Sequence, residues 1–196
     1  SYARTQKDQV ITVTIATQGT YMELPHTRLV TLKLMNGAPV ASVKIDGKPV
    51  PFAYSRYGDS PQTWTYDGED VATVLRLPTH KVAAESTVEV TFAPDAVSGM
   101  ALLAGVKGMV RRGTAAKAEL DLVRTTPGAH ESGFGALDRL AILGDDLARL
   151  AGKSDLTGWI GAAAGAAKRL EDAVSEVKAM KQDGARTSHV LALLDF

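Results

Sequence analysis

The sequence predicts an α+β protein, in which an N-terminal antiparallel β-sandwich is followed by a small antiparallel α-helical bundle. Eight of the eleven aromatic residues and seven of the eight prolines lie before residue 98. After that point alanine, leucine and glycine predominate, and the apolar residues take up a helical spacing. We therefore expect a β-sandwich domain over residues 1–97 and a helical bundle over residues 98–196.

The strands are predicted by apolar residues at every second position. In the segment VITVTIA of residues 10–16, Ile11, Val13 and Ile15 share one face and threonines share the other. Short runs of this kind, separated by Pro, Gly and Asp, are typical of an antiparallel sandwich. The same alternation recurs at Val30, Leu32 and Leu34, at Val43 and Ile45, at Thr73, Leu75 and Leu77, and at Val88, Val90 and Phe92.

Two Asp-Gly pairs lie between these runs and predict tight hairpins. A two-residue type I′ turn needs positive φ at both of its central residues, which Asp-Gly supplies. We expect such turns at Asp46-Gly47 and at Asp67-Gly68.

Four helices are expected after residue 98, over about 99–112, 114–124, 135–151 and 154–182. In the third, Leu140, Leu143, Leu147 and Leu150 form one apolar stripe, and Gly152 is a candidate C′ cap. The fourth begins near the cap candidates Ser154 and Asp155. It directs Leu170, Val174 and Val177 inward, and Gly184 would end it. The apolar stripes predict a compact antiparallel bundle.

Composition excludes several classes of function. The formal net charge is zero and the chain has no cysteine, so the sequence shows no nucleic-acid footprint, disulfide framework or thiol nucleophile. No apolar run approaches the roughly 20 residues of a membrane span. The four histidines, His26, His80, His130 and His189, lie far apart, so we expect neither a metal nor a cofactor.

The segment TWTYDGED, residues 63–70, is the strongest candidate for chemistry. It combines two aromatic residues, Trp64 and Tyr66, with the acids Glu69 and Asp70, as carbohydrate sites do. The aromatic residues share one strand face, so they either pack in the core, which their size favours, or form an exposed platform. No pair of carboxylates in the sequence is spaced for glycoside hydrolysis, and we expect no catalytic residue.

Two longer runs suggest a family. The segments GTYMELPHTRLVTLKLMNGAPVASVKIDGKPVPF and TWTYDGEDVATVLRLP together resemble the distal C-terminal β-sandwich of glycoside hydrolase family 31, the α-glucosidases and α-xylosidases. The resemblance covers about residues 2–93. Its matching features are Gly19 and Tyr21, Pro25 and Arg28, the run PVASVKIDG from Pro39 to Gly47, and the group Trp64, Tyr66 and Asp67.

The resemblance implies a non-catalytic accessory region. In that family a (β/α)₈ barrel carries an aspartate nucleophile in an Asp-Met-Asn-Glu context, and neither occurs here, so no catalytic residue carries over. Family sandwiches begin earlier than this chain does, so we expect an incomplete sandwich with an open edge and a fragment or subunit that stays docked on the barrel and N-terminal domains of its parent enzyme. A periplasmic or secreted location is implied.

The sequence leaves two alternatives open. The first is a free-standing carbohydrate-binding module that holds an oligosaccharide on Trp64 and Tyr66, aided by Tyr21, Tyr54 or Tyr57, with Glu69 and Asp70 accepting hydroxyl hydrogen bonds. The second is an adaptor whose helical bundle binds another protein through the apolar stripe of its third helix.

Overall fold

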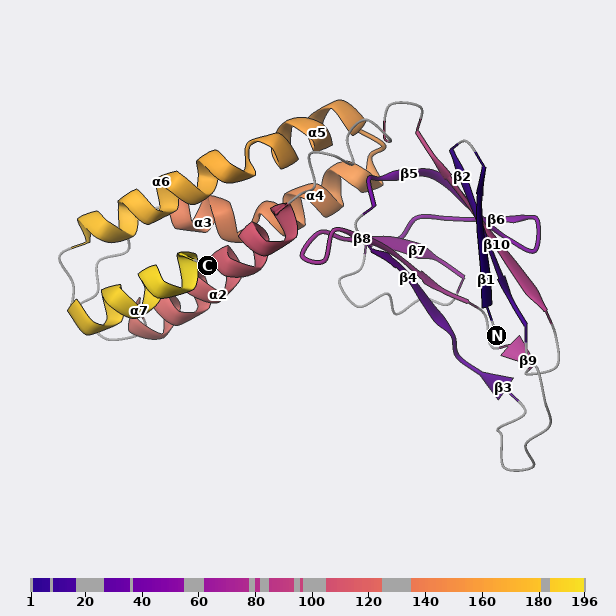
Figure 1. Cartoon of the computed structure of the whole chain (residues 1–196), viewed down its shortest axis with the longest axis horizontal. Coiled ribbons are helices and arrows are strands. Elements are labelled where there is room, and N and C mark those ends of the chain that lie inside the picture. The colour runs from indigo at the N-terminus through magenta and orange to yellow at the C-terminus, as the bar shows by residue number, and fades with distance from the viewer. Residues whose placement is uncertain are drawn as a thin grey trace.

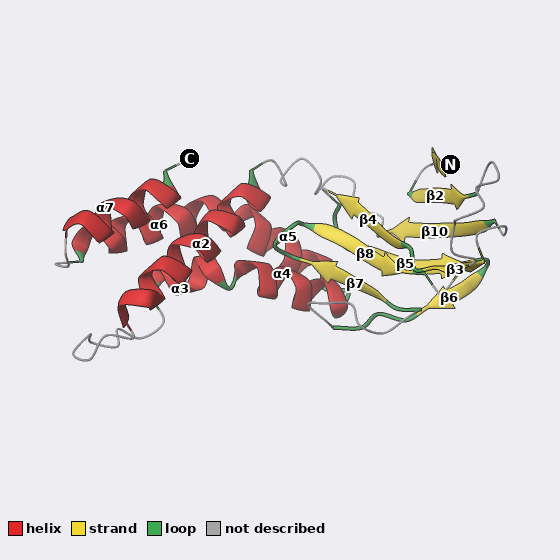
Figure 2. Cartoon of the chain, turned by 90° about the horizontal axis from the view of Figure 1, so that it is seen from below, coloured by secondary structure: helices red, strands yellow, loops and turns green. Residues whose placement is uncertain are grey.

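The computed structural model has the α+β architecture that the sequence predicts, with strands first and helices after them (Figure 1). The helices and the sheets lie end to end (Figure 2). The residues described are 2–7, 9–16, 27–35, 37–54, 62–77, 80–81, 85–93, 96, 105–124, 135–180 and 184–195.

The larger sheet has five strands in the order β1-β2-β10-β5-β6, and every neighbouring pair is antiparallel. In β10 every second residue is buried, from Ser86 to Phe92, as the alternation predicts. The bounds are β1 Tyr2–Lys7, β2 Val10–Ile15, β5 Val40–Ile45, β6 Lys48–Val50 and β10 Ser86–Phe92.

The second sheet has three antiparallel strands in the order β4-β8-β7. These are β4 Thr31–Met35, β7 Trp64–Asp67 and β8 Ala72–Arg76, and a short ladder pairs β3 Thr27–Arg28 with β9 His80–Lys81. Buried residues of the two larger sheets belong to one hydrophobic cluster, as expected for a sandwich.

The two Asp-Gly pairs behave differently. Asp46 and Gly47 have φ values of 50° and 76°, which confirms the tight turn between β5 and β6. The prediction for Asp67-Gly68 is wrong, because β7 and β8 pair Asp67 with Ala72 and leave a four-residue loop between them. In that loop Val71 takes the positive φ, 51°, although its side chain is buried.

The helical half has different boundaries from those predicted. One helix, α2, replaces the first two expected helices, and residues 99–104 lie outside the described part. The third expected helix is divided into two helices, α3 and α4, which meet at Ile142. The fourth is also divided into two, α5 and α6, which meet at Gly165. The bounds are α2 Val106–Arg124, α3 Ala136–Ala141, α4 Leu143–Gly152, α5 Leu156–Ala164, α6 Ala166–Ala179 and α7 Gly184–Leu194.

Of the residues predicted to begin or end helices, some have other roles and one has the predicted role. Gly184 begins helix α7 rather than ending its predecessor. Gly152 is the last residue of α4, and Ser154 takes the positive φ of 55° that a C′ glycine would have. Asp155 is the predicted N-cap: its Oδ1 accepts a hydrogen bond from the backbone N of Gly158 at 2.8 Å, which satisfies a free amide at the start of α5.

The leucine stripe packs inward as predicted. Leu140, Leu143 and Leu147 are fully buried, and Leu150 packs against the same cluster. This cluster is continuous with the core of the sheets, so the two halves share one hydrophobic core. The rings of Tyr66 in β7 and Trp159 in α5 meet edge to face across the boundary, with centroids 6.1 Å apart.

Close approach at this boundary depends on glycine. A Cβ atom on Gly68, in the β7–β8 loop, would overlap the backbone carbonyl of Gly144 in α4. A Cβ atom on Gly152, at the end of the same helix, would overlap the ring of Phe52. Helix α4 therefore meets the sheets along a surface that has no room for larger side chains.

We expect Gly68→Ala to lower the free energy of unfolding by about 1–3 kcal/mol, because the added methyl group forces two backbones apart. Gly161→Ala is the matched control: a Cβ there meets nothing within 4 Å, and alanine in helix α5 should stabilise by about 0.5–1 kcal/mol. Urea denaturation of both variants measures the difference. Equal effects in the two variants would contradict close packing at Gly68.

Candidate functional site

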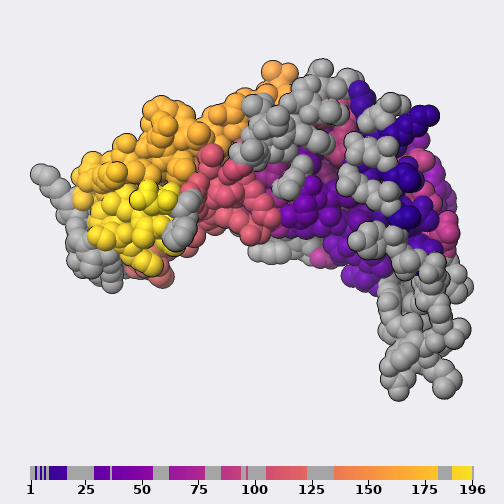
Figure 3. All heavy atoms as spheres, in the orientation of Figure 1, coloured from indigo at the N-terminus to yellow at the C-terminus, as the bar shows by residue number. Residues whose placement is uncertain are grey.

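The candidate site lies where the β7–β8 loop meets helices α2 and α4. In the space-filling view the atoms of α2 lie directly against those of the sheets (Figure 3). Hydrogen bonds within the loop fix its conformation. Asp67 Oδ1 accepts hydrogen bonds from the backbone N of Glu69 at 3.1 Å and from the backbone N of Asp70 at 3.0 Å. These bonds hold the two following acids in fixed positions.

Three cations from two elements converge on the loop. Lys33, in β4, bonds both Asp67 and Asp70, with Nζ 2.7 Å from Asp67 Oδ2. From helix α2, Lys107 Nζ lies 3.1 Å from Asp70 Oδ1, and Arg111 bonds the same oxygen. We call these five residues, Lys33, Asp67, Asp70, Lys107 and Arg111, the Asp70 cluster.

The charges in the Asp70 cluster shift the pKa values of Asp70 and Lys33. The hydrogen bond from Lys33, aided by Lys107 and the charge of Arg111, outweighs burial and lowers the pKa of Asp70 to about 2. Burial alone would lower the pKa of Lys33, but its bonds to Asp67 and Asp70 raise it. Both groups are therefore firmly ionised near neutral pH.

This environment is unsuited to acid catalysis of glycoside cleavage. A catalytic acid must hold its proton near neutral pH, which needs a raised pKa, and the pKa of Asp70 is lowered. Its oxygens are also engaged by cations, so they are poorly placed to attack a sugar carbon. What the arrangement does is hold the loop against α2.

The aromatic residues of the segment pack in the core, which was the favoured interpretation of the sequence. Trp64 is 6% exposed and Tyr66 is 2% exposed. The Tyr66 hydroxyl donates to the carbonyl of Gly37 at 2.8 Å, and burial raises its pKa. Trp64 meets Phe52 edge to face, with centroids 4.8 Å apart.

The predicted stacking platform needs correction, because a buried ring cannot present its face to a sugar. Trp64 and Tyr66 are therefore unavailable as a carbohydrate platform in this conformation. Contact of Glu69 and Asp70 with a sugar stays a prediction; both are partly buried. Of the other tyrosines named for this role, Tyr54 is 63% exposed, and Tyr21 and Tyr57 lie outside the described residues.

Sequence reasoning did not identify the partners of Asp70. Lys107 and Arg111 are four residues apart, which places them on one face of a helix, where they could contact an anion. Their spacing does not indicate which anion. No sequence pattern predicts the contact of Lys33 with Asp67, because only the pairing of β4 with β8 and of β8 with β7 brings the two residues together.

A second group of polar residues stabilises the bundle. Lys117 in α2 pairs with Asp121, at 2.7 Å, and with Asp138, at 3.1 Å. Glu176 in α6 accepts the backbone N–H of Leu137 at 2.8 Å, which caps α3 across the bundle. These contacts join three helices, so we assign them a structural role.

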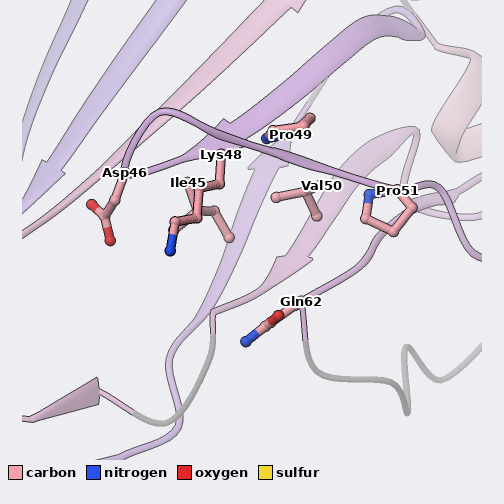
Figure 4. Close-up of a pocket in the computed structure, with 7 residues that line it drawn as sticks. All are labelled: Ile45, Asp46, Lys48, Pro49, Val50, Pro51 and Gln62. Carbon is pink, nitrogen blue, oxygen red and sulfur yellow. The ribbon is translucent and has the colours of Figure 1, made fainter.

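One surface hollow, of about 230 Å³, lies beside the β5–β6 hairpin (Figure 4). Three of its lining residues have polar side chains, Asp46, Lys48 and Gln62, and the Asp46 carboxylate accepts from the backbone N of Thr87 at 2.8 Å. It is lined by Ile45, Asp46, Lys48, Pro49, Val50, Pro51 and Gln62.

The described residues contain no group of three or more histidines and carboxylates that could hold a metal ion. Among the described helices, none combines the length and the apolar character that a membrane span requires.

We expect Asp70→Asn to lower the free energy of unfolding by about 1–2 kcal/mol at pH 7, because three cations lose their anion. Since the folded pKa of Asp70 is lowered to about 2 from 3.8, the stabilisation is complete above about pH 4 and is lost as the pH falls toward 2. The difference between wild type and variant in urea unfolding should shrink over that range. Glu171→Gln, at an exposed position on α6, should change stability little at either pH.

Titration with maltooligosaccharides should leave the tryptophan fluorescence unchanged at millimolar ligand. Trp64 is 6% exposed and Trp159 is fully buried, so neither indole can be covered by a bound sugar. A saturable shift in emission, abolished in Trp64→Phe, would contradict this expectation and restore the carbohydrate-binding interpretation.

No model of a known protein family matches the chain, and no curated protein sequence matches it significantly.

Proposed function

We propose that this chain is a non-catalytic accessory region of a family 31 α-glycosidase. In this proposal the hydrolysis of α-glucosidic or α-xylosidic bonds takes place in a barrel domain that is not part of this chain. The sandwich supports that barrel, and the helices add packing or an oligomer contact. The partners are the barrel and N-terminal domains of the same enzyme.

One observation carries the proposal. Four of the chemically promising groups in the segment TWTYDGED have structural roles: the rings of Trp64 and Tyr66 are in the core, Asp67 orders the loop, and Asp70 binds three cations. A segment whose acids and rings are used in this way supports a scaffold better than it supports an active site.

The shared core of the two halves supports a scaffolding role. The sheets and helices meet through apolar packing, through the Tyr66–Trp159 contact and through the Asp70 cluster. A closely packed boundary of this kind resists bending, so a force on the sheets is transmitted to the helices. The family itself rests on the order of motifs between Gly19 and Leu77 in the sequence.

Two observations make the alternatives weaker. The carbohydrate-binding module needs exposed rings at Trp64 and Tyr66, and both are buried. The adaptor needs an exposed leucine stripe on the third expected helix, and three of its four leucines are fully buried.

Co-purification tests the proposal. An affinity-tagged chain should be recovered from its native cells with a larger polypeptide, identified by mass spectrometry, that carries a barrel and the Asp-Met-Asn-Glu motif. The eluate should hydrolyse p-nitrophenyl α-glucoside or α-xyloside. The purified chain alone should hydrolyse neither substrate, because in this proposal the barrel that carries the nucleophile is not part of it.

Two controls make this result interpretable. An unrelated protein that carries the same tag should recover neither the larger chain nor the activity. The Asp70→Asn variant of the isolated chain should be as inactive as wild type. Recovery of a lone 20.7 kDa species without activity would contradict the accessory role.

A further inference from the structure

The two larger sheets end in four edge strands: β1 and β6 in one, β4 and β7 in the other. An edge strand has backbone N–H and C=O groups on one side that can pair with another chain. Natural proteins protect such edges with proline, with charged side chains or with a covering segment.

Three of the four edges carry such protection. Strand β6 contains Pro49 beside the exposed Lys48. Strand β7 is covered by the segment of residues 51–53: Trp64 N donates to Pro51 O at 3.1 Å, and Ala53 N donates to Trp64 O at 2.9 Å. Strand β1 exposes the polar side chains of Thr5 and Lys7.

On the outer side of strand β4, the part of the chain that the structure describes provides no such protection. The carbonyl of Val30 accepts the N–H of Leu77 at 2.9 Å, and the register continues with Leu32 opposite Leu75. Because backbone groups alternate in direction along a strand, those of Thr31 and Lys33 point away from β8. No strand in the described part of the chain pairs with that side of β4.

The side chains along this edge are also unusual. Leu29 is 61% exposed and Met35 is 44% exposed, which places two large apolar residues at the ends of the same short segment. Lys33 is the one charged residue of β4, and it extends across the sheet to Asp67 and Asp70. The charged side chain of Lys33, which could otherwise prevent another strand from pairing with the outer edge of β4, is thus held away from that edge.

We propose that the β4 edge pairs antiparallel with β4 of a second copy of this chain, about a two-fold axis at Leu32. In this register Thr31 lies opposite Lys33 of the second copy, and Leu29 lies opposite Met35. The exposed apolar residues of each copy then cover those of the other, and no like charges face each other. The two three-stranded sheets become one six-stranded sheet.

Neighbouring registers are less favourable. An axis at Lys33 places the two lysines directly opposite each other, which is destabilising. An axis at Thr31 places Lys33 opposite Leu29 and Met35 opposite Thr27, so the apolar residues no longer meet. Of these three registers, only the one with its axis at Leu32 keeps the two lysines from facing each other and brings the exposed apolar residues together.

The expected dimer is weak. One pair of short strands buries less than the roughly 1,200 Å² of a standard interface, so association should depend on concentration in the range that ultracentrifugation covers. This inference does not rest on the proposed function, because it uses only the geometry of β4.

Sedimentation velocity of the full chain over a wide concentration range tests the proposal. The wild-type mass should rise from 20.7 kDa toward twice that value. Met35→Lys should raise the Kd about tenfold, because it removes an apolar contact twice per dimer. Thr31→Pro should do the same by removing the outward N–H while leaving the pairing with β8 intact.

Leu122→Lys is the matched control, since Leu122 is 69% exposed on α2, outside β4, and its substitution should leave the Kd unchanged. Circular dichroism confirms that each variant is folded. A wild type that stays at 20.7 kDa at every concentration overturns the proposal. So does a dimer that both edge variants leave intact, or one that Leu122→Lys weakens equally.

Discussion

The contact between the β7–β8 loop and helix α4 is the constraint on which the rest of the structure depends. There the backbone at Gly68 lies so close to the carbonyl of Gly144 that neither a side chain nor water can separate them. This approach places Asp70 beside α2 and lets Tyr66 reach Trp159. The sheets and helices therefore form one packed unit with a single core.

The β7–β8 loop adopts an unfavourable backbone conformation where it makes this contact. Val71, a β-branched residue, has φ of 51°, a region that such residues rarely enter. Its buried side chain and the bonds around Asp67 and Asp70 offset the cost. Strain of this kind persists where the surrounding structure over-determines the conformation, and here the surroundings are a packed junction.

The same cluster has a consequence for the neighbouring strand. Lys33 neutralises Asp67 and Asp70, and in doing so it leaves the outer side of β4 with exposed Leu29 and Met35. An interaction that stabilises the inside of the molecule thus shapes a surface on its outside. The proposed role as a scaffold in a larger enzyme and the proposed pairing of two β4 edges are compatible with each other.

The sequence by itself determined the α+β class, most strands, the inward face of the leucine stripe and the turn at Asp46-Gly47, because these follow from local periodicity and local φ preferences. It did not determine the β7–β8 loop, the joints at Ile142 and Gly165, or the start of α7 at Gly184. Tertiary packing decided these features. The size of Trp64 and Tyr66 already favoured their burial. The meeting of Lys33 with Asp70 depends on contacts between residues far apart in the chain, which no local pattern encodes.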